Sequence, residues 1–258
     1  MNVTRRQLLG SLGFTAGVAG ATLLAGCAGT PPPAPDEEKK EPRDWVYVPL
    51  DPAAVAAEAY RLFADGGCMY GVFAAIVTTL AERVGEPFQS FPVYMMKYGE
   101  GGTGGWGSLC GTLNGGAALI GLFERDKDRR AQLITELFSW YEKTELPAYR
   151  PEPRTESPEI QKSAAGSVLC HVSVSRWCEA SAYEVFSKEM IERCRRLTAD
   201  GTAKAVELLN RSLEKPCEPA GLSPEVKSCL SCHGKGELRD AMGKMRCGAC
   251  HKFPKRHP

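Results

Sequence analysis

Two copies of Cys-x-x-Cys-His near the C-terminus constrain this chain more than any other feature. The first copy spans residues 229–233, and the second spans residues 247–251. This is the spacing of covalent c-type haem attachment, in which both cysteines bond to the porphyrin and the histidine binds the iron from one side. The sequence therefore predicts two attached haems. The attachment residues would be Cys229, Cys232, Cys247 and Cys250, with His233 and His251 as axial ligands.

Two other kinds of site also use paired cysteines. The same residues form Cys-x2-Cys-x14-Cys-x2-Cys, which is close to a zinc-ribbon pattern, and a disulfide within each pair is a third alternative. A four-cysteine zinc site needs no histidine, yet a histidine follows each pair in a chain that has only four histidines. This coincidence favours haem over zinc or disulfides.

The N-terminal residues 1–26 predict export. Thr4-Arg5-Arg6, followed by an apolar stretch to Leu24, is typical of a twin-arginine signal peptide. The segment ends Leu24-Ala25-Gly26-Cys27, which resembles a lipoprotein processing site at which Cys27 is lipidated. An ordinary cleaved signal peptide is the alternative, and a retained membrane span is disfavoured because the stretch is glycine-rich and only just long enough.

Residues 27–44 are rich in proline and charge and have little to bury, so they predict a tether without a fold of its own. We therefore expect a periplasmic protein whose contact with the membrane is a lipid anchor alone. The remaining chain suits a helical cysteine-rich domain over residues 45–215 and a diheme segment over residues 216–258.

The balance of charge argues against a polyanionic partner. The chain has 32 basic and 31 acidic residues, for a formal net charge of +1, so no nucleic-acid partner is expected. Basic residues gather in the tail from Lys227 to His257. They either attract an acidic redox partner and offset haem propionates or form an ordinary solvated surface.

The body of the chain has the apolar periodicity of helices, and an all-α bundle is expected. Alternating strand patterns are nearly absent, and residues 92–96 are the best short candidate. Asp51-Pro52 supplies a helix start. The expected helices span residues 53–63, 68–84, 126–146 and 188–213, with a break at Asp65-Gly66-Gly67 and a further helix around residues 114–119.

A glycine-rich stretch over residues 98–111 precedes that last helix. It lacks the Gly-Lys-Ser/Thr of a phosphate-binding loop, and no clear strand precedes it, which excludes a dinucleotide fingerprint. Backbone N–H groups in such a stretch can face an anionic group, and a cofactor carrying sulfide or thiolate charge is one interpretation. The other is a tight loop that packs helices together.

Six cysteines remain after the four haem cysteines and Cys27 are set aside. Disulfides are the default in an exported protein, but these cysteines lie on expected helices and the glycine loop rather than in a loop-rich scaffold. Four thiolates suit an iron–sulfur cluster, and the twin-arginine route carries folded proteins that could contain one. The six are Cys68, Cys110, Cys170, Cys178, Cys194 and Cys217.

Three segments and one further cysteine resemble the redox family named for its C…GCAxxG…C…C pattern. They are residues 66–73, 104–111 and 169–178, followed by Cys194. With the two haem motifs, residues 45–258 are similar to the split-Soret cytochromes c. The sequence departs from the pattern at Thr112, where alanine is expected after Cys110-Gly111.

The resemblance implies a helical homodimer with two stacked haems in each subunit and haem ligands exchanged between subunits. It also implies an additional iron–sulfur site, for which we expect a [2Fe–2S] cluster. The family's four cysteines correspond to Cys68, Cys110, Cys170 and Cys194. Cys178 is an alternative to one of them, and Cys217 has no assigned role.

Two histidines remain for the two vacant axial positions. They are His171 and His257. His257 lies so soon after His251 that it more readily reaches a different haem, in this chain or in a partner subunit. Met242 and Met245 are rival ligands, while a buried His171 and an unliganded terminal His257 are the structural alternatives. Counting histidines favours bis-histidine ligation.

Bis-histidine iron has no open position for a substrate, so the sequence predicts a low-potential electron carrier rather than an enzyme. A reductase in which the haems supply a catalytic site is the alternative. A zinc- or disulfide-bearing lipoprotein that only binds partners is a third. No catalytic triad, paired-carboxylate site or nucleotide motif indicates hydrolytic or group-transfer chemistry.

Overall fold

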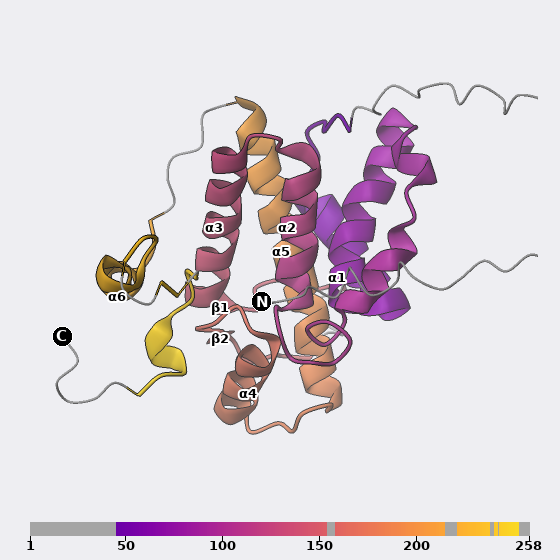
Figure 1. Cartoon of the computed structure of the whole chain (residues 1–258). Coiled ribbons are helices and arrows are strands. Elements are labelled where there is room, and N and C mark those ends of the chain that lie inside the picture. The colour runs from indigo at the N-terminus through magenta and orange to yellow at the C-terminus, as the bar shows by residue number, and fades with distance from the viewer. Residues whose placement is uncertain (1–44, 154–157, 215–220, 238–239, 242, 253–258) are drawn as a thin grey trace, which may run out of the picture. The chain divides into compact units, whose positions relative to one another are not determined.

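The computed structural model describes residues 45–153, 158–214, 221–237, 240–241 and 243–252. The expected signal peptide and tether, Cys27, Cys217, Met242 and His257 lie outside these residues. The described part folds mainly into helices, as the sequence predicts (Figure 1). The helices are α1 (Pro52–Val84), α2 (Gly111–Phe123), α3 (Lys127–Lys143), α4 (Cys170–Ser181), α5 (Lys188–Glu214) and α6 (Pro224–His233).

Helix α1 joins the two helices expected over residues 53–63 and 68–84. Its N-terminus is capped by Asp51, whose carboxylate accepts a hydrogen bond from the Ala53 N–H at 2.9 Å. Gly66 and Gly67 have non-helical backbone angles, and Gly67 has φ of 77°, a conformation that favours glycine. The expected break is therefore present as a kink within one continuous element.

The core lies where α1 packs along α5 and α2 (Figure 1). The apolar half of α1 after the kink is buried there, and each large side chain it removes from water stabilises the fold by roughly 1.5–3 kcal/mol. By length and composition α1 could cross a membrane, but it occupies the position of a core helix. The buried side chains include Val72, Phe73, Ile76, Leu80, Leu113, Leu119, Leu197 and Leu208.

Helix α3 ends three residues earlier than expected, at Lys143. Leu146 is instead part of a two-residue strand, β1 (Glu145–Leu146), which pairs antiparallel with β2 (Ser163–Ala164). The reason is Pro147, since a proline disfavours the helical conformation of the residue before it. The N-terminus matches the expectation, because the Asp126 carboxylate caps α3 through the N–H of Arg129 at 2.8 Å.

The strand candidate at residues 92–96 is wrong. Pro92 caps and Val93 begins a 3₁₀ helix, η2 (Val93–Gly99), which packs against α1, and a shorter one, η1 (Phe88–Ser90), precedes it. A 3₁₀ helix repeats every three residues, and Val93, Met96 and Gly99 are the residues that pack inward. The apolar residues of this short run fit the three-residue period of a 3₁₀ helix as well as the two-residue period of a strand. Their pattern therefore does not distinguish the two structures.

The C-terminal segment contains α6 and a 3₁₀ turn, η4 (Cys247–Ala249). Ser223 caps α6 and Pro224 occupies its first turn, a start signal that the sequence analysis passed over. An ion pair of 3.0 Å between Arg246 and Glu225 joins the two parts of the segment. Lys244 donates a hydrogen bond of 3.1 Å to Thr135 of α3.

Candidate metal and haem sites

Four of the six body cysteines line one small buried cavity of about 20 Å³. They come from four different helices or helix starts, so distant parts of the sequence meet at this point. The set equals the four expected to belong together, and Cys178 is not a member. The four are Cys68 after the α1 kink, Cys110 at the N-cap of α2, Cys170 at the first residue of α4, and Cys194 in α5.

Backbone pairing brings two of these cysteines side by side. The Cys110 N–H donates to the Val168 carbonyl at 2.9 Å, and the Cys170 N–H donates to the Ser108 carbonyl at 2.6 Å. Leu109 and Leu169 form an antiparallel bridge between these bonds. The end of the glycine-rich stretch and the start of α4 are therefore fixed together.

A missing side chain makes room for the third cysteine. A Cβ atom placed on Gly111 would lie 2.4 Å from the Cys68 sulfur and 2.6 Å from the Gly99 carbonyl oxygen. No side chain fits at these distances, so Cys68 can approach the start of α2 only because residue 111 is glycine. This contact gives a physical reason for glycine directly after Cys110.

Burial raises the pKa values of three of these thiols and so keeps them protonated in the absence of a metal. It raises the pKa of Cys170 to about 12, and the neighbouring Cys110 and Cys194 add to the effect. Burial likewise raises the pKa values of Cys68 and Cys194. A metal that binds here must displace these protons, because the thiolate is the ligand.

A buried arginine supplies positive charge beside the sulfurs. Arg193 is 1% exposed, and its guanidinium lies 3.8 Å from the Cys194 sulfur and donates a 2.8 Å hydrogen bond to the Ser173 hydroxyl. Ser173 also accepts a 2.8 Å hydrogen bond from Tyr141. No carboxylate of the described residues pairs with Arg193, although a buried charge without a counter-charge is costly.

The donor set, four thiols beside a buried guanidinium, has the chemistry of an anionic, thiolate-bound centre. Thiolates at this cavity would place negative charge next to the Arg193 guanidinium. Among the described residues, no group of three or more His, Cys, Asp or Glu side chains is arranged closely enough to hold a metal ion. The four cysteines nevertheless line one cavity, and thiolates are the usual ligands of iron–sulfur centres.

Cys178 does not line the cavity. It is partly buried against the small apolar cluster of Ile160, Trp177 and Met190, against which Cys194 also packs. Because Cys178 lies outside the cavity lining, the structure favours Cys170 over Cys178 as the fourth member.

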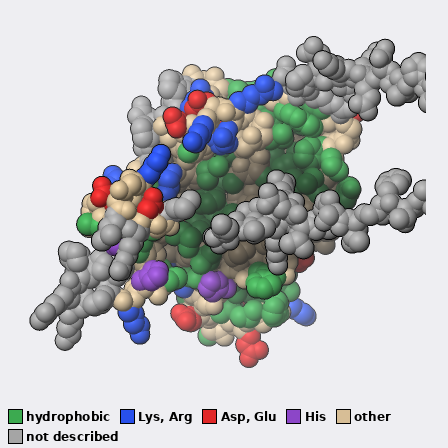
Figure 2. Space-filling model, viewed as in Figure 1, with side chains coloured by type: hydrophobic (Ala, Val, Ile, Leu, Met, Phe, Trp, Pro, Cys, Tyr) green, Lys and Arg blue, Asp and Glu red, His purple; other side chains and the backbone are tan. Residues whose placement is uncertain are grey.

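His171 follows Cys170 directly but is exposed at the surface. Its Nδ1 lies 2.9 Å from the Gly107 carbonyl oxygen, which also accepts the His171 backbone N–H at 3.1 Å. A proton on Nδ1 leaves Nε2 with a free lone pair, which is the form that binds iron. Histidine side chains are visible on the face drawn in Figure 2.

The glycine-rich stretch is a tight loop rather than an anion cradle. Its own carbonyls accept the N–H groups of residues 104–108, with Gly104 N–H to Tyr98 O at 2.8 Å and Gly107 N–H to Gly101 O at 2.9 Å. These donors are therefore not available to an anionic group. The loop presents Trp106, which is 88% exposed, and the Gly107 carbonyl that holds His171.

The first cysteines of the two haem motifs lie together. Burial raises the pKa of the Cys247 thiol, and a hydrogen bond with the Cys229 thiol adds to this. Cys229, Cys232, Cys247 and Cys250 are all free thiols, and the His251 N–H donates to the Cys247 carbonyl at 2.9 Å. His233 ends α6, so both motifs present their histidines next to short helical turns.

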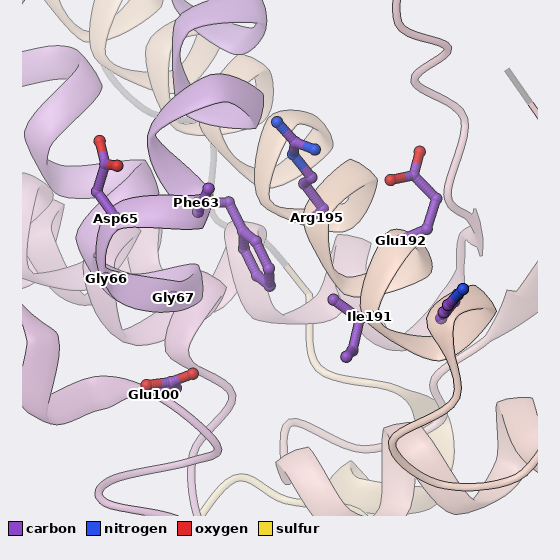
Figure 3. A pocket seen from close by; sticks show the side chains of 10 residues that line it. Phe63, Asp65, Gly66, Gly67, Glu100, Ile191, Glu192 and Arg195 are labelled. Atoms are coloured by element: carbon purple, nitrogen blue, oxygen red, sulfur yellow. The ribbon is translucent and has the colours of Figure 1, made fainter. Parts of the chain in front are cut away.

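A wider cavity of about 480 Å³ lies at the α1 kink and contains neither cysteine nor histidine (Figure 3). Glu192 and Arg195 come from α5, and Glu100 comes from the glycine-rich loop. Glu192 is already paired with Arg196 at 2.7 Å, and Arg195 lies over the Tyr60 ring at 4.0 Å. Glu192 and Arg195 are thus already engaged within the protein, and no cysteine or histidine lines this cavity.

The residues that surround the cysteines, above all Arg193, were not predicted from the sequence. A signal for it exists, because Arg193 lies three residues after Met190 and four before Leu197, on the apolar face of α5. A charged residue on a buried face needs a partner and points to a site.

These observations define a class: an all-α protein in which four thiols from separate helices enclose a cavity beside an exposed histidine, a design suited to redox chemistry. The model of the C_GCAxxG_C_C redox-active protein family matches residues 71–208. The chain is 38% identical to split-Soret cytochrome c of Desulfovibrio desulfuricans, over 97% of this chain and 95% of that protein. The chain belongs to this family of redox-active proteins, among the split-Soret cytochromes c.

A solved structure gives the same result. It is that of split-Soret cytochrome c from Desulfovibrio desulfuricans, described as having a novel iron centre. It matches this chain with a TM-score of 0.77 and 37% identity, covering 82% of this chain and 91% of that one. The likeness therefore extends to the fold of most of the chain.

Proposed function

We propose that this protein is a periplasmic electron carrier that holds two bis-histidine c-type haems and an iron–sulfur cluster. One observation carries the proposal: Cys170, which lines the cysteine cavity, and His171, an exposed imidazole, are consecutive residues. If Cys170 binds the cluster and His171 binds a haem iron, one backbone step connects the two ligands. This arrangement suits electron transfer between the cluster and the haem. Split-Soret cytochrome c, the relative at 38% identity, is a haem protein by its name.

The two Cys-x-x-Cys-His motifs would hold the haems. Cys229 and Cys232 would attach one haem, and Cys247 and Cys250 the other, with His233 and His251 as the first axial ligands. The contact between the Cys229 and Cys247 thiols supports two neighbouring haems. Haem iron with two histidine ligands exchanges electrons and has no open position for bond chemistry.

His171 and His257 would provide the remaining axial ligands. The exposure of His171 supports a ligand that reaches a haem outside its own helical domain, including a haem of a second subunit. The Gly107 carbonyl holds the proton on Nδ1, fixes the ring and directs Nε2 toward the iron. We therefore propose a homodimer in which subunits exchange haem ligands.

Cys68, Cys110, Cys170 and Cys194 would bind the cluster, for which we propose the [2Fe–2S] type. The protonated thiols release their protons on binding, and Arg193 offsets the negative charge that results. A cluster requires assembly before export, which agrees with the twin-arginine signal. Lipidation of Cys27 would then hold the protein at the membrane.

The experiment that tests this function is a visible and EPR spectrum of the mature protein, made with haem-maturation machinery. We expect low-spin c-type bands with a split Soret peak, together with an iron–sulfur EPR signal after reduction. High-spin haem in the resting protein would contradict bis-histidine ligation and favour the reductase. The absence of haem bands would overturn the proposal.

A further inference from the structure

Thr112 is a buried polar residue in the wall of the cysteine cavity. It is 1% exposed and lines the cavity with Cys68, Cys110, Cys170 and Cys194. Its hydroxyl has no hydrogen-bond partner, and the Nε of Arg193, which lines the same cavity, has none either. Native proteins seldom leave a buried polar group unpaired, because the loss amounts to about 1–3 kcal/mol. Two unpaired groups beside four sulfurs indicate that the missing acceptor belongs to the cavity.

Other threonines of this protein show what Thr112 lacks. In a helix, a threonine hydroxyl commonly donates to the carbonyl four residues earlier. Thr78 does so to Ala74 at 2.7 Å, and Thr202 does so to Thr198 at 2.8 Å. Thr112 is the second residue of α2, so the carbonyl four residues earlier belongs to Ser108, outside the helix. That carbonyl already accepts the Cys170 N–H at 2.6 Å.

Helix α5 fixes the orientation of the Thr112 side chain. A Cβ atom on Gly201 would lie 2.1 Å from the Thr112 methyl carbon, so this methyl occupies the space that Gly201 leaves open. Glycine inside a helix costs about 0.5–1 kcal/mol relative to alanine. With the methyl group held against α5, the hydroxyl lies on another side of this side chain, which belongs to a residue that lines the cysteine cavity.

We propose that the Thr112 hydroxyl donates a hydrogen bond to a sulfur atom of the iron–sulfur cluster and thereby raises its reduction potential. The inference rests on the proposed cluster and concerns a residue at which this chain departs from the family's alanine. Reduction by one electron adds negative charge to the sulfurs. A hydrogen-bond donor stabilises that reduced form more than the oxidised one, and such bonds are among the factors that set cluster potentials.

The test compares Thr112→Val and Thr112→Ser in the mature, haem-loaded protein. Valine keeps the shape and the methyl group but removes the donor, whereas serine keeps the hydroxyl and removes the methyl group. An EPR-monitored redox titration would give the cluster potential, and the haem potentials of the same sample are the internal control. We expect Thr112→Val to lower the equilibrium constant for cluster reduction about tenfold, or about 59 mV for one electron. Thr112→Ser should remain near the wild type.

Each other outcome is decisive. A wild-type cluster potential in Thr112→Val would overturn the inference and leave the proposed function intact. Loss of the cluster from both variants would overturn it too, because packing of the whole side chain would then be the cause. Loss from the valine variant alone would support it. If the wild type holds no cluster, the iron–sulfur part of the proposed function fails and this inference fails with it.

Discussion

Cys170 and His171 are consecutive residues at the start of α4, and they face different surroundings. The Cys170 thiol lines a small cavity with three other cysteines, while His171 is exposed and bonded to Gly107 through Nδ1 at 2.9 Å. Successive residues at a helix start project in different directions, so one backbone step connects the interior with the surface. This pair is where a buried centre and a surface haem would meet.

Replacing His171 by alanine should convert one of the two proposed haems in each subunit from low spin to high spin, because its iron loses the sixth ligand. Visible and EPR spectra measure the conversion. Glu179→Ala is the matched control, since Glu179 is exposed on the same helix. A fully low-spin spectrum in His171→Ala would contradict this ligand assignment.

The contact between Gly107 and His171 gives a second prediction. A Cβ atom on Gly107 would lie 2.9 Å from the His171 Cβ, and the residue has φ of 66°. Gly107→Ala should therefore displace the imidazole and produce a high-spin fraction. Its backbone strain costs roughly 1–2 kcal/mol.

The variant Gly104→Ala separates displacement of the His171 imidazole from backbone strain at a positive φ. Gly104 has φ of 59°, and a Cβ atom there would meet nothing within 4 Å. The free energy of unfolding of the Gly104→Ala variant, measured by urea titration, should fall by about 1–2 kcal/mol, as expected for Gly107→Ala. Its haem spectrum should stay unchanged, and equal spectra for the two alanine variants would refute the positioning role of Gly107.

The sequence could predict most helices but not the surroundings of the site. Helix α5 was expected at residues 188–213 and spans Lys188–Glu214, because a long apolar periodicity determines such an element. The run at residues 92–96 is too short for its period to separate a strand from a 3₁₀ helix.

The grouping of the four cavity cysteines was predicted in a different way from the helices. Its members are scattered from residue 68 to residue 194, and spacing alone does not bring them together, so the grouping came from resemblance to a family. The unpaired Thr112 hydroxyl follows only from the packing of α2, α4 and α5 around one cavity, whereas the place of Arg193 on the apolar face of α5 is a signal in the sequence itself.

Two glycines of α2 should respond to alanine in opposite ways. At Gly111 the new Cβ would meet the Cys68 sulfur at 2.4 Å, so Gly111→Ala should cost about 1–3 kcal/mol and reduce cluster content. Gly121 is exposed, with nothing within 4 Å of a Cβ, and Gly121→Ala should stabilise the helix by about 1 kcal/mol. Urea unfolding and iron analysis measure both, and an unchanged iron content in Gly111→Ala would contradict the close approach of Cys68.

The pH dependence of the iron-free protein follows from the buried thiols. Burial raises the pKa of Cys170 from an ordinary value near 9 to about 12 in the folded state. Between these two values the unfolded chain has released the proton and the folded chain retains it, so stability is fully present below pH 9 and falls as pH rises toward 12. The slope is about 1.4 kcal/mol per pH unit for one such thiol. Urea unfolding at pH 8 and pH 10 measures it. Cys170→Ser is the control and should show a weaker loss, because serine does not titrate in this range; equal losses in both proteins would show that Cys170 is not the group responsible.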